Sequence, residues 1–222
     1  MNKKITSIIS VAMVFTAMIN LTAQEDKYVK LANKVSISND SDAWLKVSVP
    51  FNLISHPRLE DTRNSRPSTL EEAFNPEYLE GLKVKLYLCF NNEFKKKVLR
   101  SSKLIDSQFY QYYGAEVEFK TIKIERTTKY ANFVFPAAIA EKDGFGGSYI
   151  NPVGYAVEIF VEGVPAEISN DIFFDKYRDE PTLMKFKQQA QEKSSQNEGV
   201  LLPAHHVFSN YFQKGAYLVP KE

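Results

Sequence analysis

A stretch of strict two-residue alternation, from Leu82 to Phe90, constrains the possible fold of this chain more than any other feature. Large apolar side chains occupy every second position, and lysine, tyrosine and cysteine stand between them. Such a period of two is typical of a β-strand that is buried on one face. A single strand cannot bury five large apolar side chains by itself, so the sequence requires a second layer over that face.

Further stretches with apolar alternation predict more strands. They lie at 28–37, 45–53, 96–105, 115–126, 130–135 and 155–161, with one more at 207–212 or 217–219. Pro50 cannot donate a hydrogen bond to a neighbouring strand, so its strand is expected at a sheet edge or broken there. The apolar phase slips by one residue near Lys120, which indicates a β-bulge or a change of sheet.

Helical patterns are sparse. Pro181 stands at the first position of a segment whose apolar stripe runs to Ala190, which predicts a helix. Because that stripe is narrow, we expect this helix to pack on an edge of the sheets. Ser68 and Glu71 have the spacing of a capping box, which predicts one or two further helical turns. The glycine-containing segment 137–149 is expected to be a mobile loop.

Several short alternating strands without alternating helices favour a mainly β chain. We predict an immunoglobulin-like antiparallel β-sandwich with one or two short peripheral helices, and an open β-barrel is the alternative. The length of 24–222 suits a single β-sandwich domain with a sizeable core.

The amino terminus has the pattern of a secretory signal peptide. Lys3 and Lys4 precede an apolar run at 5–21, and Leu21-Thr22-Ala23 resembles a cleavage site. Residues 1–23 are therefore predicted to be a signal peptide; a retained membrane anchor is the alternative reading, although polar residues dilute the run. We therefore expect an exported protein that is located in the periplasm, the outer envelope or the cell surface. After processing it would have no integral membrane span.

Charge and cysteine content exclude several classes of partner and fold. The formal net charge is +1, and loss of Lys3 and Lys4 would change it to −1. The longest basic run is only Lys95-Lys96-Lys97, so nucleic acid is not an expected partner. Cys89 is the single cysteine, so the monomer has to fold without a disulfide.

No pattern of catalytic chemistry is present. The chain lacks the short motifs of serine hydrolases, zinc proteases, phosphate-binding loops and calcium loops. His205 and His206 are neighbours, and adjacent side chains on a strand point to opposite faces, so they are not expected to bind one metal ion together. Cys89 is expected to be a buried, inert thiol. We therefore predict a non-enzymatic protein with no catalytic residues, metal ligands or cofactors.

Aromatic residues supply the candidate contacts for a partner. The densest aromatic tract is 109–113, in which Tyr110 and Tyr112 share one face of a continued strand. They either form a contact patch for a partner or second copy, or cover the flank under the long loop or the helix from Pro181. Phe145 and Tyr149, in the predicted loop, are further candidates for partner contact.

Three stretches carry a resemblance to a known family. They are W-L-K-V-S-V-P-F from Trp44, L-E-G-L-K-V-K-L-Y-L-C-F-N-N from Leu79 and G-Y-A-V-E-I-F-V-E-G from Gly154. Together with the signal sequence, they resemble the small secreted pilus-like proteins of Verrucomicrobia, Akkermansia in particular. The resemblance implies an immunoglobulin-like fold akin to archaeal type IV pilin heads. It also implies association with a type IV pilus-like apparatus that has an outer-membrane secretin, and it carries no catalytic residues.

The chain departs from true pilins at its amino terminus. Pilins keep an apolar helix after processing, whereas cleavage after Ala23 would remove the only segment able to form it, and no glycine precedes Gly81. The first functional hypothesis is therefore a structural or accessory component of a type IV pilus-like assembly. Its partners would be envelope or pilus-like assembly proteins, or the protein itself. The alternative is a secreted immunoglobulin-like binding module for glycans or host proteins.

Overall fold

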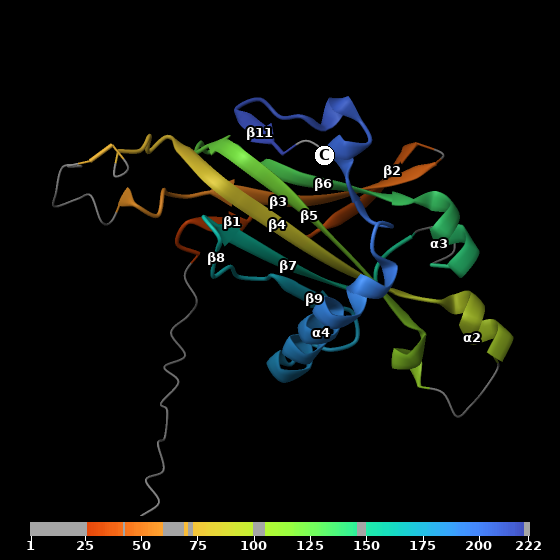
Figure 1. Ribbon diagram of the computed structural model, residues 1–222. Coiled ribbons are helices and arrows are strands. Elements are labelled where there is room, and N and C mark those ends of the chain that lie inside the picture. Colours follow the sequence, from red (N-terminus) through yellow and green to blue (C-terminus); the bar gives the residue numbers. More distant parts are fainter. Residues whose placement is uncertain are drawn as a thin grey trace, which may run out of the picture.

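Two antiparallel β-sheets lie face to face in the computed structural model (Figure 1). The structure describes residues 26–41, 43–59, 69–70, 73–99, 105–145 and 150–219. The predicted signal peptide and the capping box at Ser68 and Glu71 lie outside these residues. Within them, the first sheet contains β1 (Val29–Leu31), β3 (Trp44–Leu53), β6 (Lys129–Pro136) and β10 (Leu202–Pro203) in that order, with β2 (Ser36–Ser41) also on β3. We call it the five-stranded sheet.

The second, six-stranded sheet has the longest strands. Its order is β11 (Ala216–Leu218), β5 (Tyr110–Lys123), β4 (Tyr78–Asn91), β7 (Gly154–Val161) and β8 (Val164–Pro165), with β9 (Ile172–Phe174) also on β7. The described helices are α2 (Glu93–Leu99), α3 (Ala137–Asp143) and α4 (Glu180–Lys193). Short 3₁₀ turns lie at η1 (Asp106–Phe109), η2 (Ser194–Asn197), η3 (Ala204–His206) and η4 (Ser209–Tyr211).

The chain crosses between the two sheets three times from β3 to β7. Strands β3 and β6 pair in one sheet, whereas β4 and β5, which lie between them in sequence, pair in the other. Strand β7 then returns to pair with β4. The predicted mainly β sandwich is confirmed, and the two sheets do not close into a barrel.

Strand β4 provides the centre of the core, as its alternation predicts. Leu82, Val84, Leu86 and Leu88 are all fully buried against the other sheet. The strand begins earlier than predicted, because Gly81 has a φ of +62° that allows Leu79 and Leu82 to face the core three residues apart.

The predicted phase slip in β5 is also present. Phe119 and Ile122 are both fully buried, and the register with β11 shifts between Tyr217 and Leu218. This register shift confirms an irregularity near Lys120. The later of the two predicted tail strands is also confirmed, because 216–218 forms β11, whereas 209–211 forms the turn η4.

The expectation for Pro50 is wrong. Strand β3 is continuous and interior, paired with β6 on one side and with β1 and β2 on the other. Pro50 lies where that outer partner changes, because β2 pairs with 44–48 and β1 pairs with 51–53. A residue without an N–H group fits this gap between two partners. The same gap divides the single strand predicted at 28–37.

Two segments predicted as strand and loop are helices. The strand expected at 96–105 is wrong in its first part, because 93–99 forms α2. Its first turn is capped by Asn92, whose Oδ1 accepts a hydrogen bond from the Lys95 N–H at 2.8 Å. The loop expected at 137–149 contains α3, which ends at Gly144 with a φ of +67°.

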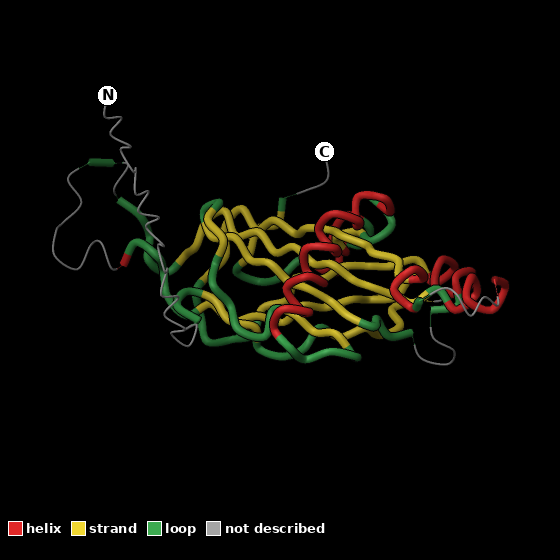
Figure 2. The backbone as a smooth tube through the Cα atoms, turned by 90° about the horizontal axis from the view of Figure 1, so that it is seen from below, coloured by secondary structure: helices red, strands yellow, loops and turns green. Residues whose placement is uncertain are grey.

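Helix α4 begins as predicted but lies elsewhere. Pro181 stands in its first turn, and the Asp179 side chain accepts a hydrogen bond from the Thr182 N–H at 3.1 Å. Figure 2 shows the helix crossing the outer face of the six-stranded sheet instead of its edge. It closes a second apolar cluster there, made by Cys89, Tyr112, Ala156, Phe174, Phe186 and Ala190.

Candidate ligand-binding groove

A polar groove of about 540 Å³ lies on the outer face of the five-stranded sheet. Its floor follows from the alternation of the strands, since every second residue of β2, β3 and β6 points away from the core. The register places Ser36, Ser48 and Asn132 directly opposite one another across the three strands. The Ser48 Oγ donates a hydrogen bond to the Asn132 Oδ1 at 2.8 Å, which holds both side chains in place.

One wall of the groove comes from a distant part of the chain, residues 210–213. The Tyr211 hydroxyl donates a hydrogen bond to the Asp40 carboxylate on β2. At the other end, the Gln213 side-chain amide donates to the Tyr130 carbonyl oxygen and accepts from the Tyr130 N–H at 3.1 Å. The wall is thus tied to both β2 and β6, so the groove is formed before any ligand arrives.

Packing next to the groove supports this wall. The Trp44 and Phe208 rings meet edge to face with centroids 6.3 Å apart. Val134, Ala204 and Tyr211 form a small buried cluster beneath them. The carboxyl-terminal segment therefore covers one end of the outer face.

Two aromatic rings are partly open to solvent in the groove. Tyr130 is 44% exposed and Phe212 is 49% exposed, and both line it. Lys46 also lines it, with its Nζ 4.9 Å from the centroid of the Tyr211 ring. Partial burial and the Asp40 carboxylate raise the pKa of Tyr211 above its ordinary value, so this phenol stays a neutral donor.

The lining offers groups that can hold a ligand. Hydroxyl and amide groups both donate and accept hydrogen bonds, and the aromatic rings add apolar surface. Across the described residues, no group of three or more His, Cys, Asp or Glu residues could hold a metal ion.

The predicted contact residues Tyr110 and Tyr112 lie on the opposite sheet, under α4. Tyr112 is only 3% exposed, and its hydroxyl donates to the Gln189 Oε1 at 3.3 Å. Tyr110 is half-buried, with its ring edge to face on Phe174. Of the two alternatives, the flank under the helix is therefore the observed one, and Tyr112 offers no surface to a partner.

The prediction for Phe145 is wrong. Phe145 is 2% exposed and stacks on Phe90, with ring centroids 4.7 Å apart and planes 7° from parallel. The chain after α3 turns back toward the core because Gly144 adopts a left-handed conformation there. Tyr149 lies outside the described residues.

Cys89 and His205 occupy buried positions. Cys89 is fully buried under α4, and burial raises the pKa of its thiol to about 12, as expected of an inert cysteine. His205 and His206 lie in the turn η3 and not on a strand, with ring centroids 4.4 Å apart. The His205 Nε2 donates to the Val219 carbonyl oxygen at 2.9 Å, and burial lowers the pKa of this ring.

Sequence reasoning missed the groove. Its floor was visible in principle, because Ser48 and Asn132 occupy outward positions between predicted core residues. Its wall was not, since nothing in the local sequence connects 210–213 with strands more than eighty residues earlier.

The comparisons with known proteins do not add to this picture. No protein-family model, curated protein or solved structure matches the chain. Over the part of the chain that is described, no helix is long and apolar enough to cross a membrane.

Proposed function

We propose that this chain is a non-enzymatic, exported binding module that holds a neutral glycan in the groove of the five-stranded sheet. The observation that supports this proposal is the combination of a preformed polar floor with two half-exposed aromatic rings. The volume of about 540 Å³ falls within the usual range for small-molecule sites, roughly 300–1,000 Å³.

The chemistry of a sugar matches this lining on two counts. Sugar hydroxyls both donate and accept hydrogen bonds, and the hydroxyls of Ser36 and Ser48 together with the amide of Asn132 can supply both kinds of partner. The C–H faces of a sugar ring are apolar and pack on aromatic rings such as Tyr130 and Phe212. Because the wall is already tied down by hydrogen bonds, little conformational entropy is lost when a ligand binds.

A glycan array tests the proposal. We expect the purified protein to retain one class of neutral glycan, and Tyr130→Ala and Phe212→Ala each to weaken retention about tenfold, the effect of removing roughly 1.4 kcal/mol of contact. Tyr217→Ala is the matched control, because Tyr217 is 53% exposed but lies on β11 of the other sheet. Absence of any retained glycan, or equal retention by the groove variants and the control, would contradict the proposal.

A second candidate function is a structural or accessory part of a type IV pilus-like assembly. The three stretches from Trp44, Leu79 and Gly154 support it through their resemblance to pilus-like proteins. A pull-down from envelope extracts of the source organism tests it. Recovery of a secretin with pilus-assembly proteins is the expected result, and recovery of neither would count against this function.

Export is part of both candidate functions and can be tested separately. The Leu21-Thr22-Ala23 pattern supports cleavage that leaves Gln24 as the first residue. Mass spectrometry of the native protein should find that amino terminus. A retained Met1 would show that the segment is not a cleaved signal.

A further inference from the structure

Helix α2 is exposed over most of its surface. None of its residues is buried, and Phe94 is 57% exposed, Val98 63% and Leu99 56%. Large apolar side chains in a short helix are ordinarily packed against a neighbour, because burial is what stabilises helices of this length. We call residues 94–99 the tip surface.

Helix α2 is nevertheless well anchored at its amino-terminal end. Asn92, directly before the helix, is fully buried, and its N–H donates to the Phe109 carbonyl oxygen at 3.0 Å. Its Oδ1 accepts from the Lys95 N–H, and its carbonyl oxygen accepts from the Lys96 N–H at 3.2 Å. The helix is thus fixed at its base while its side chains point outward.

The tip surface combines apolar and cationic side chains. Phe94 and Val98 are four residues apart and share one side of the helix, and Lys95, Lys96 and Lys97 occupy the positions between them. No acidic residue lies within 94–99. Ile105, which is 66% exposed, adds another apolar side chain shortly before η1.

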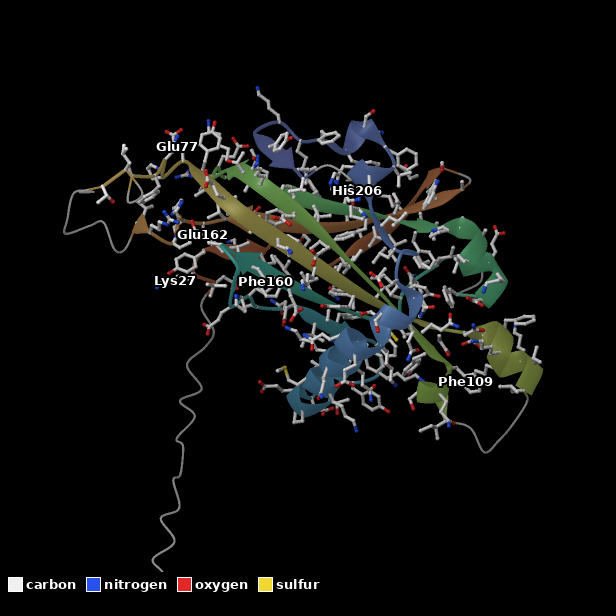
Figure 3. The ribbon with its side chains drawn as sticks, in the orientation of Figure 1. Lys27, Glu77, Phe109, Phe160, Glu162 and His206 are labelled. Atoms are coloured by element: carbon white, nitrogen blue, oxygen red, sulfur yellow. The ribbon has the colours of Figure 1, made fainter. Side chains whose placement is uncertain are left out.

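This surface lies at one end of the molecule. Figure 1 shows α2 beside α3 at the end of the sandwich away from β1 and β8. Phe109 marks the same end in Figure 3, whereas Glu77 and Glu162 mark the opposite one. The tip surface can therefore meet a flat partner without obstruction from the sheets.

We infer that the tip surface docks the protein on an anionic membrane surface. Phe94 and Val98 enter the boundary between headgroups and acyl chains, where amphipathic helices place their apolar side chains. The lysine stems lie along this apolar surface while their ammonium groups reach the lipid phosphates. This inference concerns a different face from the groove and does not depend on glycan binding.

The charge pattern disfavours a second copy of the chain as the occupant. A two-fold contact through α2 would bring together three lysines from each copy, with Glu93 as the single acidic residue of the helix to offset them. A groove in a partner protein suits a helix with several apolar anchors along one stripe, whereas the shared side of α2 offers only Phe94 and Val98. A lipid surface accommodates both kinds of side chain around the helix.

Vesicle co-sedimentation tests the inference. The probes are vesicles of phosphatidylcholine alone and vesicles of equal parts phosphatidylcholine and phosphatidylglycerol. The wild-type protein should sediment with the anionic vesicles, less so as salt is added, and remain in solution with the neutral ones. Two variants should each reduce the bound fraction at least about tenfold. The first is the double variant Phe94→Ser with Val98→Ser, and the second is the triple variant Lys95→Gln, Lys96→Gln and Lys97→Gln.

The control is Val164→Ser with Met184→Ser, two apolar residues that are 66% and 56% exposed outside the tip surface. It should sediment like the wild type. Equal binding of the wild type to neutral and anionic vesicles, or unchanged binding by either tip variant, would overturn the inference. The inference would also be overturned by a wild-type protein that does not bind vesicles and forms dimers in sedimentation velocity, if Phe94→Ser with Val98→Ser makes it monomeric. Glycan retention should remain intact in both tip variants, which separates this test from that of the groove.

Discussion

Replacing Phe186 with alanine tests whether α4 is an integral part of the fold. Phe186 is 4% exposed, stacks on Phe174 at a centroid distance of 4.7 Å and lies 6.2 Å from the Tyr112 ring. Truncation of a buried phenylalanine costs about 3–5 kcal/mol. The helix closes its cluster from the outside, so its neighbours can relax, and we expect a loss near the lower value, about 3 kcal/mol. Urea denaturation followed by circular dichroism measures the free energy of unfolding.

The matched control is Met184→Ala on the same helix. Met184 is 56% exposed, so its truncation should change the free energy of unfolding by less than about 0.5 kcal/mol. Equal losses for the two variants would refute the view that the Phe186 ring holds the helix on the sheet.

Cys89 offers a second readout of the same perturbation. It is the single cysteine, it is fully buried beneath α4, and burial raises the pKa of its thiol to about 12. A thiol reagent reaches it only when the helix opens. A loss of about 3 kcal/mol in helix docking should speed labelling about a hundredfold, since each 1.4 kcal/mol is tenfold. Labelling of Phe186→Ala at the wild-type rate would contradict the predicted burial under the helix.

Core packing, backbone crowding and protonation each provide one further prediction. Leu86→Ala should cost about 2–5 kcal/mol because Leu86 is fully buried, and Lys85→Ala less than about 1 kcal/mol; equal losses in chemical denaturation would mean that both faces of β4 are buried. Gly154→Ala should lower the melting temperature through a cost of about 1–3 kcal/mol, because the new Cβ would lie 2.5 Å from the Phe174 Cδ2; an unchanged melting temperature would contradict this crowding. Burial lowers the pKa of His205 below 6.5, so the unfolded chain binds more protons and stability should fall as the pH drops through 6.5. His205→Gln should therefore reduce the loss of stability on acidification, and an identical pH profile would show that His205 does not contribute.

The sequence predicts the sandwich because burial on one face imposes a period of two. In β4, that period places Leu82 to Leu88 in the core without ambiguity, since a shift of one residue would expose all of them. The phase slip near Lys120 was readable for the same reason. Local pattern is sufficient wherever a strand has one wet and one buried face.

The errors arise where one hydrogen bond or one distant contact decides the structure. The pattern at 96–105 fits a strand as well as a helix, and the Asn92 cap selects the helix. Phe145 stands among glycines, which predicts an exposed loop, yet the stack on Phe90 buries it. Helix α4 has a narrow apolar stripe, but Cys89 and Tyr112 on the sheet supply the rest of the cluster.

The groove shows the same limit at the level of function. Outward serine and asparagine residues on strands are ordinary surface features by themselves. They become a site only because Tyr211 and Gln213 tie a remote segment across the sheet. Such long-range pairing has no signature in a single sequence.

Nuclear magnetic resonance titration with the glycan best retained on the array tests the central claim most directly. Amide shifts should change along the groove, at Ser36 and Ser48 on β2 and β3, at Asn132 on β6 and at Gln213 on the wall. The outer face of the six-stranded sheet, including Tyr87 and Lys85, should remain unchanged. Shift changes gathered on that face, with the groove residues unaffected, would contradict the proposal that the groove binds the glycan.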